Sequence, residues 1–422
     1  MTWMSNRFNF LFIKPLLPIF YSIISVIVAA SYFIYLGMYQ KENIISLFGI
    51  SSTIIFLSIH FSSLGADHSI VSDKNKDGLV KKISKADQLS IDYRVFFPII
   101  SIFISFLFLQ IIRAIPNNRI ISEIFSDLVW HMEIAVIFVL IIFFATLTKV
   151  LTSYLITAKY INLANLYYLG KSLGLLSGVI IYELFFNFNI LVIFLTMEFF
   201  VFCFLFAIYI ALLNKIKWSK GMYESKYLLS GFNVFGFDSI MKIDLLVLSF
   251  FGSNYEIARY AVLSNVFEGL SQLITSLQIK YASLLREAIN TKNIKTSLQK
   301  EFRNLLQHTK LISFLFFPAA YIFYSLVFNL PSISIVILII LFQVTLFFGA
   351  APIVTFFTYS IIKQPLKLLI ITFCSLIFNI LISVLLYNYL NVYGVILASL
   401  ITFISLRFTI LSKSRLIFQL QN

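Results

Sequence analysis

Charged residues and cysteines are scarce in this 422-residue chain. Only 12% of the residues are charged, whereas 60% are hydrophobic and 17% are aromatic. These proportions are far from those of soluble domains and argue against a soluble catalytic module in the chain. The two cysteines, Cys203 and Cys374, lie inside apolar runs rather than in the loops that favour a structural disulfide. The composition therefore indicates a polytopic membrane protein.

Motifs for metal or nucleotide chemistry are also missing. The four histidines show no metal-ligand spacing, and no glycine-rich phosphate-binding loop occurs anywhere in the sequence. The sequence therefore predicts no bound metal, no cofactor and no ATP hydrolysis by this chain.

Acidic residues are fewer than basic ones, which gives a formal net charge of +14. Basic residues beside membrane spans are explained by the excess of Lys and Arg in cytoplasmic loops, so we expect no nucleic-acid partner.

Hydrophobic runs of about 20 residues, the length that crosses a bilayer, recur along the whole chain. The sequence predicts an all-α fold with about twelve transmembrane helices and no strands. A polar segment near the midpoint divides these spans into two six-helix bundles, residues 1–214 and 215–422. The predicted spans are 15–37, 44–64, 95–115, 128–157, 161–184, 188–213, 229–251, 255–286, 308–329, 332–358, 366–389 and 391–412.

Lys and Arg are concentrated in every second connection. One such connection holds the cluster from Lys74 to Arg94, and another holds the cluster from Lys215 to Lys226. The positive-inside rule then places both termini in the cytoplasm, with Asn391 in an outer turn.

Polar side chains follow one face of several predicted spans. In the eighth span, Asn265, Glu268 and Gln272 recur at steps of three and four, and in the eleventh Asn379 continues a similar stripe. Lys149 lies near the cytoplasmic end of the fourth span. Hydroxyl and amide stripes often serve to bond neighbouring helices, whereas buried ionisable residues usually face a watered cavity or a functional partner.

The seventh span, FGFDSIMKIDLLVLSFFG at 235–252, carries three charges where each faces a large penalty in lipid. Asp238 and Lys242 are four residues apart and can pair on one face, whereas Asp244 points to a different face. We expect Asp244 to pack against helices of its own bundle. Two interpretations of Lys242 stay open: a buried pair with Asp238 that fixes the helix, or a cation that lines a central cavity.

Three stretches resemble the polysaccharide flippases of the multidrug, oligosaccharidyl-lipid and polysaccharide exporter superfamily. The clearest is MKIDLLVLSFFGSNYEIARYAVLSN, in which Lys242, Asp244, Gly252 and Tyr260 match the family's signature and Ala258 replaces its usual Gly. The others are PLKLLIITFCSLIFNILISVLLYNYLNVYGVILASLITF near the C-terminus and LGMYQKENIISLFGISS with SSLGADHSIV near the N-terminus.

The resemblance implies two six-helix bundles around a central cavity that opens alternately to each side of the bacterial cytoplasmic membrane. It implies a transporter rather than an enzyme, which moves an undecaprenyl-diphosphate-linked O-antigen or capsule repeat unit through that cavity. Protons or sodium ions are candidate coupling ions, and a polysaccharide polymerase is a candidate partner beside membrane lipid. The candidate substrate-binding residues are Lys242, Asp238, Glu268, Gln272, Arg259, Lys149 and Asn379.

Two alternatives remain. A cation-coupled multidrug antiporter would share the fold, but some of these carry an essential acid in the first span, and residues 15–37 contain none. A polysaccharide polymerase would need a long outer loop with charged catalytic residues, whereas the predicted outer connections are short.

Overall fold

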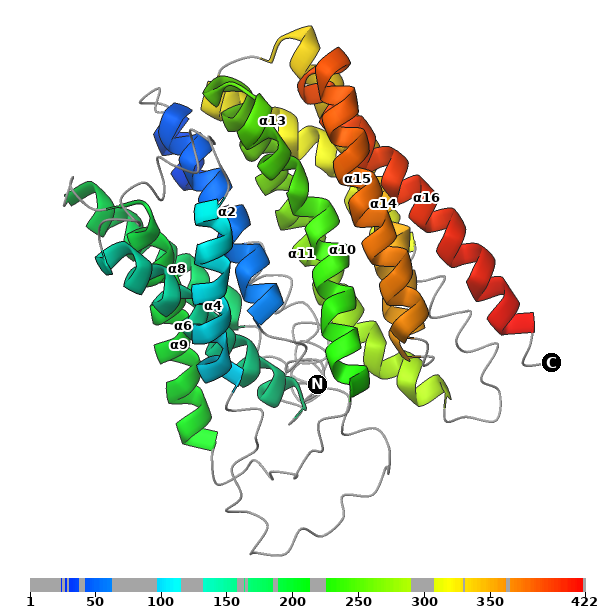
Figure 1. Ribbon diagram of the computed structural model, residues 1–422, viewed down its shortest axis with the longest axis horizontal. Helices are drawn as coiled ribbons and strands as arrows, with labels where there is room; N and C mark the ends of the chain where they lie inside the picture. Colours follow the sequence, from blue (N-terminus) through cyan, green and yellow to red (C-terminus); the bar gives the residue numbers. More distant parts are fainter. Residues whose placement is uncertain are drawn as a thin grey trace, which may run out of the picture. The chain divides into compact units, whose positions relative to one another are not determined.

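The protein is almost entirely helical in the computed structural model (Figure 1), which describes residues 24, 27–28, 30–37, 42–62, 97–114, 132–157, 163, 166–184, 189–212, 225–289, 307–328, 331–361 and 365–419. No strand occurs among these residues. The principal helices are α2 (Glu42–Ser62), α4 (Phe97–Ala114), α6 (Met132–Thr157), α8 (Leu166–Leu184), α9 (Leu191–Leu212), α10 (Ser225–Phe251), α11 (Asn254–Ile289), α13 (Phe316–Phe328), α14 (Ile333–Ile361), α15 (Pro365–Leu390) and α16 (Val392–Gln419).

The helices coincide with the predicted spans. Every predicted span from the second to the twelfth overlaps a helix, and residues 30–37, which end the first, are helical as well. Six helical segments in the described part of the chain are long and apolar enough to cross a membrane. The all-α, multi-pass fold class is confirmed.

The chain divides into two compact units. The first comprises Met1–Tyr32 and Ile50–Phe235, and the second comprises Phe33–Gly49 and Gly236–Asn422. The helices α2 and α10 therefore each contribute to both units. The bundle boundary between residues 214 and 215 stays a prediction from the sequence.

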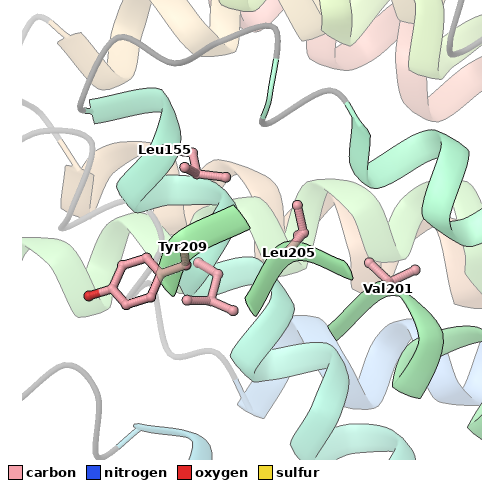
Figure 2. Close-up of a cluster of buried hydrophobic side chains, with 5 residues drawn as sticks. Leu155, Val201, Leu205 and Tyr209 are labelled. Carbon is pink, nitrogen blue, oxygen red and sulfur yellow. The ribbon is translucent and has the colours of Figure 1, made fainter. Parts of the chain in front are cut away.

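The first unit is held together mainly by apolar packing. In α8, Gly170, Gly174 and Gly178 recur every four residues and lie against α9. A Cβ atom at Gly174 would lie only 2.7 Å from the Cα atom of Met197, so the missing side chain is what allows this close approach. Val201, Leu205 and Tyr209 of α9 also pack with leucines of α6 (Figure 2).

In the second unit, α16 packs along both α14 and α15 (Figure 1). The connection from α15 to α16 is a single-residue turn at Asn391, whose φ of 49° is a left-handed conformation that Asn tolerates better than most residues. Residues 33–37 and 42–49 pack here too: the Asn254 side chain donates a hydrogen bond of 2.9 Å to Asn43, and Phe33 packs edge-on against Phe323. The N-termini of α2 and α11 therefore lie together. The Tyr387 hydroxyl, one turn before Asn391, donates to the Phe251 carbonyl at 2.8 Å, so the turn at Asn391 lies at the same end of the unit.

Candidate functional site

The middle of α10 presents charges to two different neighbours. Lys242 and Asp244 are two residues apart, about 200° around a helix, and both side chains are buried. Buried charges are stable only with partners, so their contacts define what this helix does in the second unit.

Lys242 forms an ion pair with Glu268 of α11. The Lys242 side chain is 4% exposed and the Glu268 side chain is 26% exposed, so the cation lies inside the unit and the carboxylate reaches its surface. The hydroxyl group of Ser264, one turn before Glu268, donates to the same carboxylate oxygen at 3.4 Å. The carboxylate is thus the partly solvated member of the pair.

Asp244 is the centre of a second polar cluster, which is sealed from the surface. The Tyr260 hydroxyl of α11 donates to Oδ2 of Asp244 at 2.5 Å, and the Ser399 hydroxyl of α16 lies 2.9 and 2.8 Å from its two oxygens. The Asn379 amide of α15 completes the set at 3.4 Å from Oδ1. The expectation that Asp244 packs against helices of its own bundle is confirmed.

Asn379 links three helices. Its amide nitrogen also lies 3.2 Å from the Ile240 carbonyl oxygen of α10, and its oxygen accepts a hydrogen bond from Thr402 of α16 at 3.3 Å. A small cavity of about 10 Å³ adjoins the cluster, with Asp244, Tyr260, Ser264 and Thr345 among its lining residues. This volume is enough for about one water molecule.

The residues of the signature motif, from Lys242 to Tyr260, form the helical hairpin of α10 and α11. Gly252 ends α10, where its amide donates to the Leu248 carbonyl at 2.7 Å. Ser253 and Glu256 then form a reciprocal capping box at the start of α11, with 2.8 Å from the Ser253 amide to the Glu256 carboxylate and 3.3 Å for the return bond. Tyr260 follows one turn later and bonds to Asp244. The motif therefore fixes the two helices to each other.

The other candidate residues are more dispersed. Arg259 lies near the start of α11, where its guanidinium carbon stacks 3.4 Å from the ring centre of Tyr255. Lys149 lies in α6, in the first unit, and is partly buried. Asp238 belongs to α10 and Gln272 to α11, but their side chains lie outside the described residues.

The Lys242–Glu268 pair was not predicted from the sequence, which left Lys242 either as a partner of Asp238 or as a cation that lines a cavity. The two residues are 26 positions apart on successive helices, so no fixed sequence spacing connects them. The sequence identified each of them as a charged residue in an apolar helix. To predict that they pair, one would also need to know where α10 and α11 cross. Lys242 is not on an open surface in this structure.

No known family profile matches the sequence, and no curated protein matches it. Several solved structures do match the fold of this chain. A MOP superfamily transporter from Pyrococcus furiosus is 14% identical with a TM-score of 0.67, and the match covers 96% of each chain.

An inward-facing structure of a multidrug resistance MATE family transporter of the MOP superfamily matches at 13% identity with a TM-score of 0.61, over 96% of this chain and 98% of that one. An outward-facing structure with the same description matches at 14% identity with a TM-score of 0.62, over 96% and 95%. At these identities the likeness is one of fold, and the chain has a MATE-like transporter fold.

Proposed function

We propose that this protein is a flippase of the bacterial cytoplasmic membrane, which moves an undecaprenyl-diphosphate-linked oligosaccharide to the outer leaflet by alternating access. Both termini are cytoplasmic in this proposal. The transporter fold supports the general mechanism, while the substrate class is argued from the residues of the second unit.

The ion pair of Lys242 with Glu268 is the observation that carries the proposal. A buried ammonium in the middle of an apolar helix is expensive, and its carboxylate partner is the more exposed of the two groups. An incoming diphosphate bears more negative charge than one carboxylate, so it would replace Glu268 as the partner of Lys242. The polyprenyl tail meanwhile stays in lipid, because a hydrocarbon chain needs no polar path.

The signature around α10 supports the same substrate class. Lys242, Asp244, Gly252 and Tyr260 match the motif of polysaccharide flippases, and the structure gives three of them a shared role in fixing α10 against α11. A rigid hairpin would hold the Lys242 ammonium at a constant position while substrate binds. We assign Asn379, through its bonds to Asp244, a supporting role in that rigidity.

A cation-coupled multidrug antiporter is the second candidate, because multidrug resistance transporters are among the structures that share this fold. Such a substrate is usually cationic and needs an acidic or aromatic pocket. In the ion pair between α10 and α11, the buried member is instead the Lys242 ammonium. The buried Asp244 carboxylate already accepts hydrogen bonds from Tyr260, Ser399 and Asn379.

Reconstitution in proteoliposomes separates these functions. Purified full-length protein is tested for the movement of a fluorescent undecaprenyl-diphosphate oligosaccharide to the opposite leaflet, and in parallel for ethidium uptake under a proton or sodium gradient. We expect movement of the lipid-linked glycan without ethidium uptake. Ethidium uptake without glycan movement would replace the flippase with the antiporter.

A further inference from the structure

Two basic residues of the second unit contact neighbouring phenylalanines of one helix. The ammonium nitrogen of Lys310 lies 5.9 Å from the ring centre of Phe347, and the guanidinium carbon of Arg407 lies 5.3 Å from the ring centre of Phe348. Both phenylalanines belong to α14, and their ring centres are 5.6 Å apart. Lys310 belongs to the helical segment Gln307–Phe328, which includes α13, whereas Arg407 belongs to α16. Since α14 packs against both α13 and α16, the two cations approach it from two neighbouring helices.

The helices that carry these cations have no acidic residue. Glu301 is the last acidic residue of the sequence, so the segment Gln307–Phe328 and the helices α14, α15 and α16 contain no carboxylate side chain. The lysines of the two ion pairs, in α8 and α10, each have a glutamate partner instead. Contact with a ring face does not neutralise a cation, so Lys310 and Arg407 retain the capacity to bind an anion.

The surface around the two cations is apolar and exposed. Leu311 and Phe314, which lie beside Lys310 on the same helical segment, are both 63% exposed, and Phe408, which follows Arg407, is 69% exposed. The ring centre of Phe314 lies 6.2 Å from that of Phe347, so this surface is continuous with the phenylalanines of α14. In a multi-pass membrane protein, such an apolar surface with cations at its edge is suited to contact with lipid.

The exposed face of α14 continues from the phenylalanines as a stripe of isoleucines. Ile340, Ile337 and Ile333 are exposed and recur at steps of three and four, which places them on one face with Phe347. At a rise of 1.5 Å per residue, Ile337 lies about 15 Å along the helix from Phe347, which is the depth of the hydrocarbon of one leaflet. By the predicted topology, the phenylalanine end of this stripe is the cytoplasmic one.

We propose that Lys310 and Arg407, with Phe347 and Phe348, bind the headgroup of an anionic phospholipid such as phosphatidylglycerol. A phosphate group accepts hydrogen bonds from an ammonium and from a planar guanidinium, and its acyl chains would cover the isoleucine stripe. Basic pockets between transmembrane helices on the cytoplasmic side are typical sites for anionic headgroups. The leaflet rests on the predicted topology, whereas the site itself depends on neither that topology nor the transported substrate.

Titration of the purified full-length protein in a neutral detergent with phosphatidylglycerol tests this proposal, with bound lipid counted by native mass spectrometry. We expect Lys310→Gln and Arg407→Gln each to weaken binding roughly fivefold, because each removes one cation from the phosphate. The double variant should bind roughly 25-fold more weakly if the two contacts are independent. Arg407→Lys keeps the charge and should fall between the wild type and Arg407→Gln. Phosphatidylcholine, whose headgroup is neutral overall, should bind the wild type more weakly than phosphatidylglycerol.

Arg259→Gln is the matched control. Its guanidinium also stacks on an aromatic ring of the second unit, 3.4 Å from the ring centre of Tyr255, but it lies near the start of α11. The variant removes the same charge and should leave the affinity for phosphatidylglycerol unchanged. Thermal unfolding without added lipid shows whether each variant is folded. Because Lys310 is exposed, Lys310→Gln leaves the packing of the unit intact and decides the question even if Arg407→Gln unfolds.

Three results would overturn the site. Wild-type affinity in folded Lys310→Gln would show that this cation only extends toward the bilayer surface. An equal loss of affinity in Arg259→Gln would show non-specific charge attraction. Farnesyl diphosphate, a short isoprenoid diphosphate, should displace phosphatidylglycerol poorly; displacement at a lower concentration than phosphatidylglycerol itself needs would assign this surface to a diphosphate lipid instead of a phospholipid.

Discussion

The two units each contain an ion pair between successive helices, but the buried member has the opposite sign. In the first unit, Lys171 of α8 lies 3.4 Å from Glu198 of α9; the lysine side chain is 28% exposed and the glutamate 2%. In the second unit, Lys242 is 4% exposed and Glu268 is 26% exposed. The pair in the first unit thus buries its anion, and the pair in the second unit buries its cation.

The surroundings of the two pairs differ as well. Lys171 lies 5.0 Å from the ring centre of Tyr167, and α8 and α9 are joined by their glycine contacts. The second unit places its cation beside a hydrogen-bonded cluster around Asp244 that joins α10, α11, α15 and α16. A buried cation with a displaceable partner is suited to an anionic substrate, so we propose that the second unit makes the phosphate contact.

We expect the largest loss of stability from breaking the polar cluster of the second unit. Asp244→Ala leaves Tyr260, Ser399 and Asn379 without their common acceptor, and we expect a loss of unfolding free energy on the order of 3 kcal/mol or more. Asp244→Asn keeps one acceptor oxygen and should lose clearly less. Denaturant unfolding of the purified variants measures both, and wild-type stability in Asp244→Ala would remove the cluster from the account.

We expect a smaller loss of stability from disturbing the apolar packing of the first unit. A Cβ atom at Gly174 would lie 2.7 Å from the Met197 Cα atom, whereas one at Gly170 would lie 3.4 Å from the Val201 Cα atom. Gly174→Ala should therefore cost about 2 kcal/mol through overpacking, while Gly170→Ala should be nearly neutral. Thermal unfolding in detergent compares the two; equal melting temperatures would contradict the close approach of α8 and α9.

The smallest effect concerns the turn between α15 and α16. Asn391→Val places a β-branched residue at a φ of 49° and should destabilise the protein by about 1–2 kcal/mol, whereas Asn391→Gly should not. The same unfolding assay applies. A neutral valine variant would mean that the turn adapts and does not set how closely α15 and α16 pack.

Much of the fold could be predicted from the sequence, because membrane spans have a required length and hydrophobicity. The predicted spans 366–389 and 391–412 lie within one or two residues of the observed break between α15 and α16. The opposite faces of Lys242 and Asp244 could also be predicted, because they follow from helical geometry alone.

The partners of Lys242 and Asp244 could not be predicted from the sequence. Glu268 contacts Lys242 and Ser399 contacts Asp244 only because particular helices cross, and side-chain spacing along one helix contains no information on that crossing. Asp244 itself was not among the candidate site residues, although Asn379, which bonds to it, was.

The central claim is that the buried Lys242 ammonium contacts the anionic substrate, and the double variant Lys242→Ala/Glu268→Gln tests it most directly. Removing both charges leaves no unpaired group from this pair, so protein abundance should stay near the wild-type level. The matched control is Lys171→Ala/Glu198→Gln in the first unit. Movement of lipid-linked oligosaccharide in proteoliposomes is measured beside the amount of folded protein. We expect the first double variant to be folded but inactive and the control to retain activity; full activity in Lys242→Ala/Glu268→Gln would show that the pair serves structure alone.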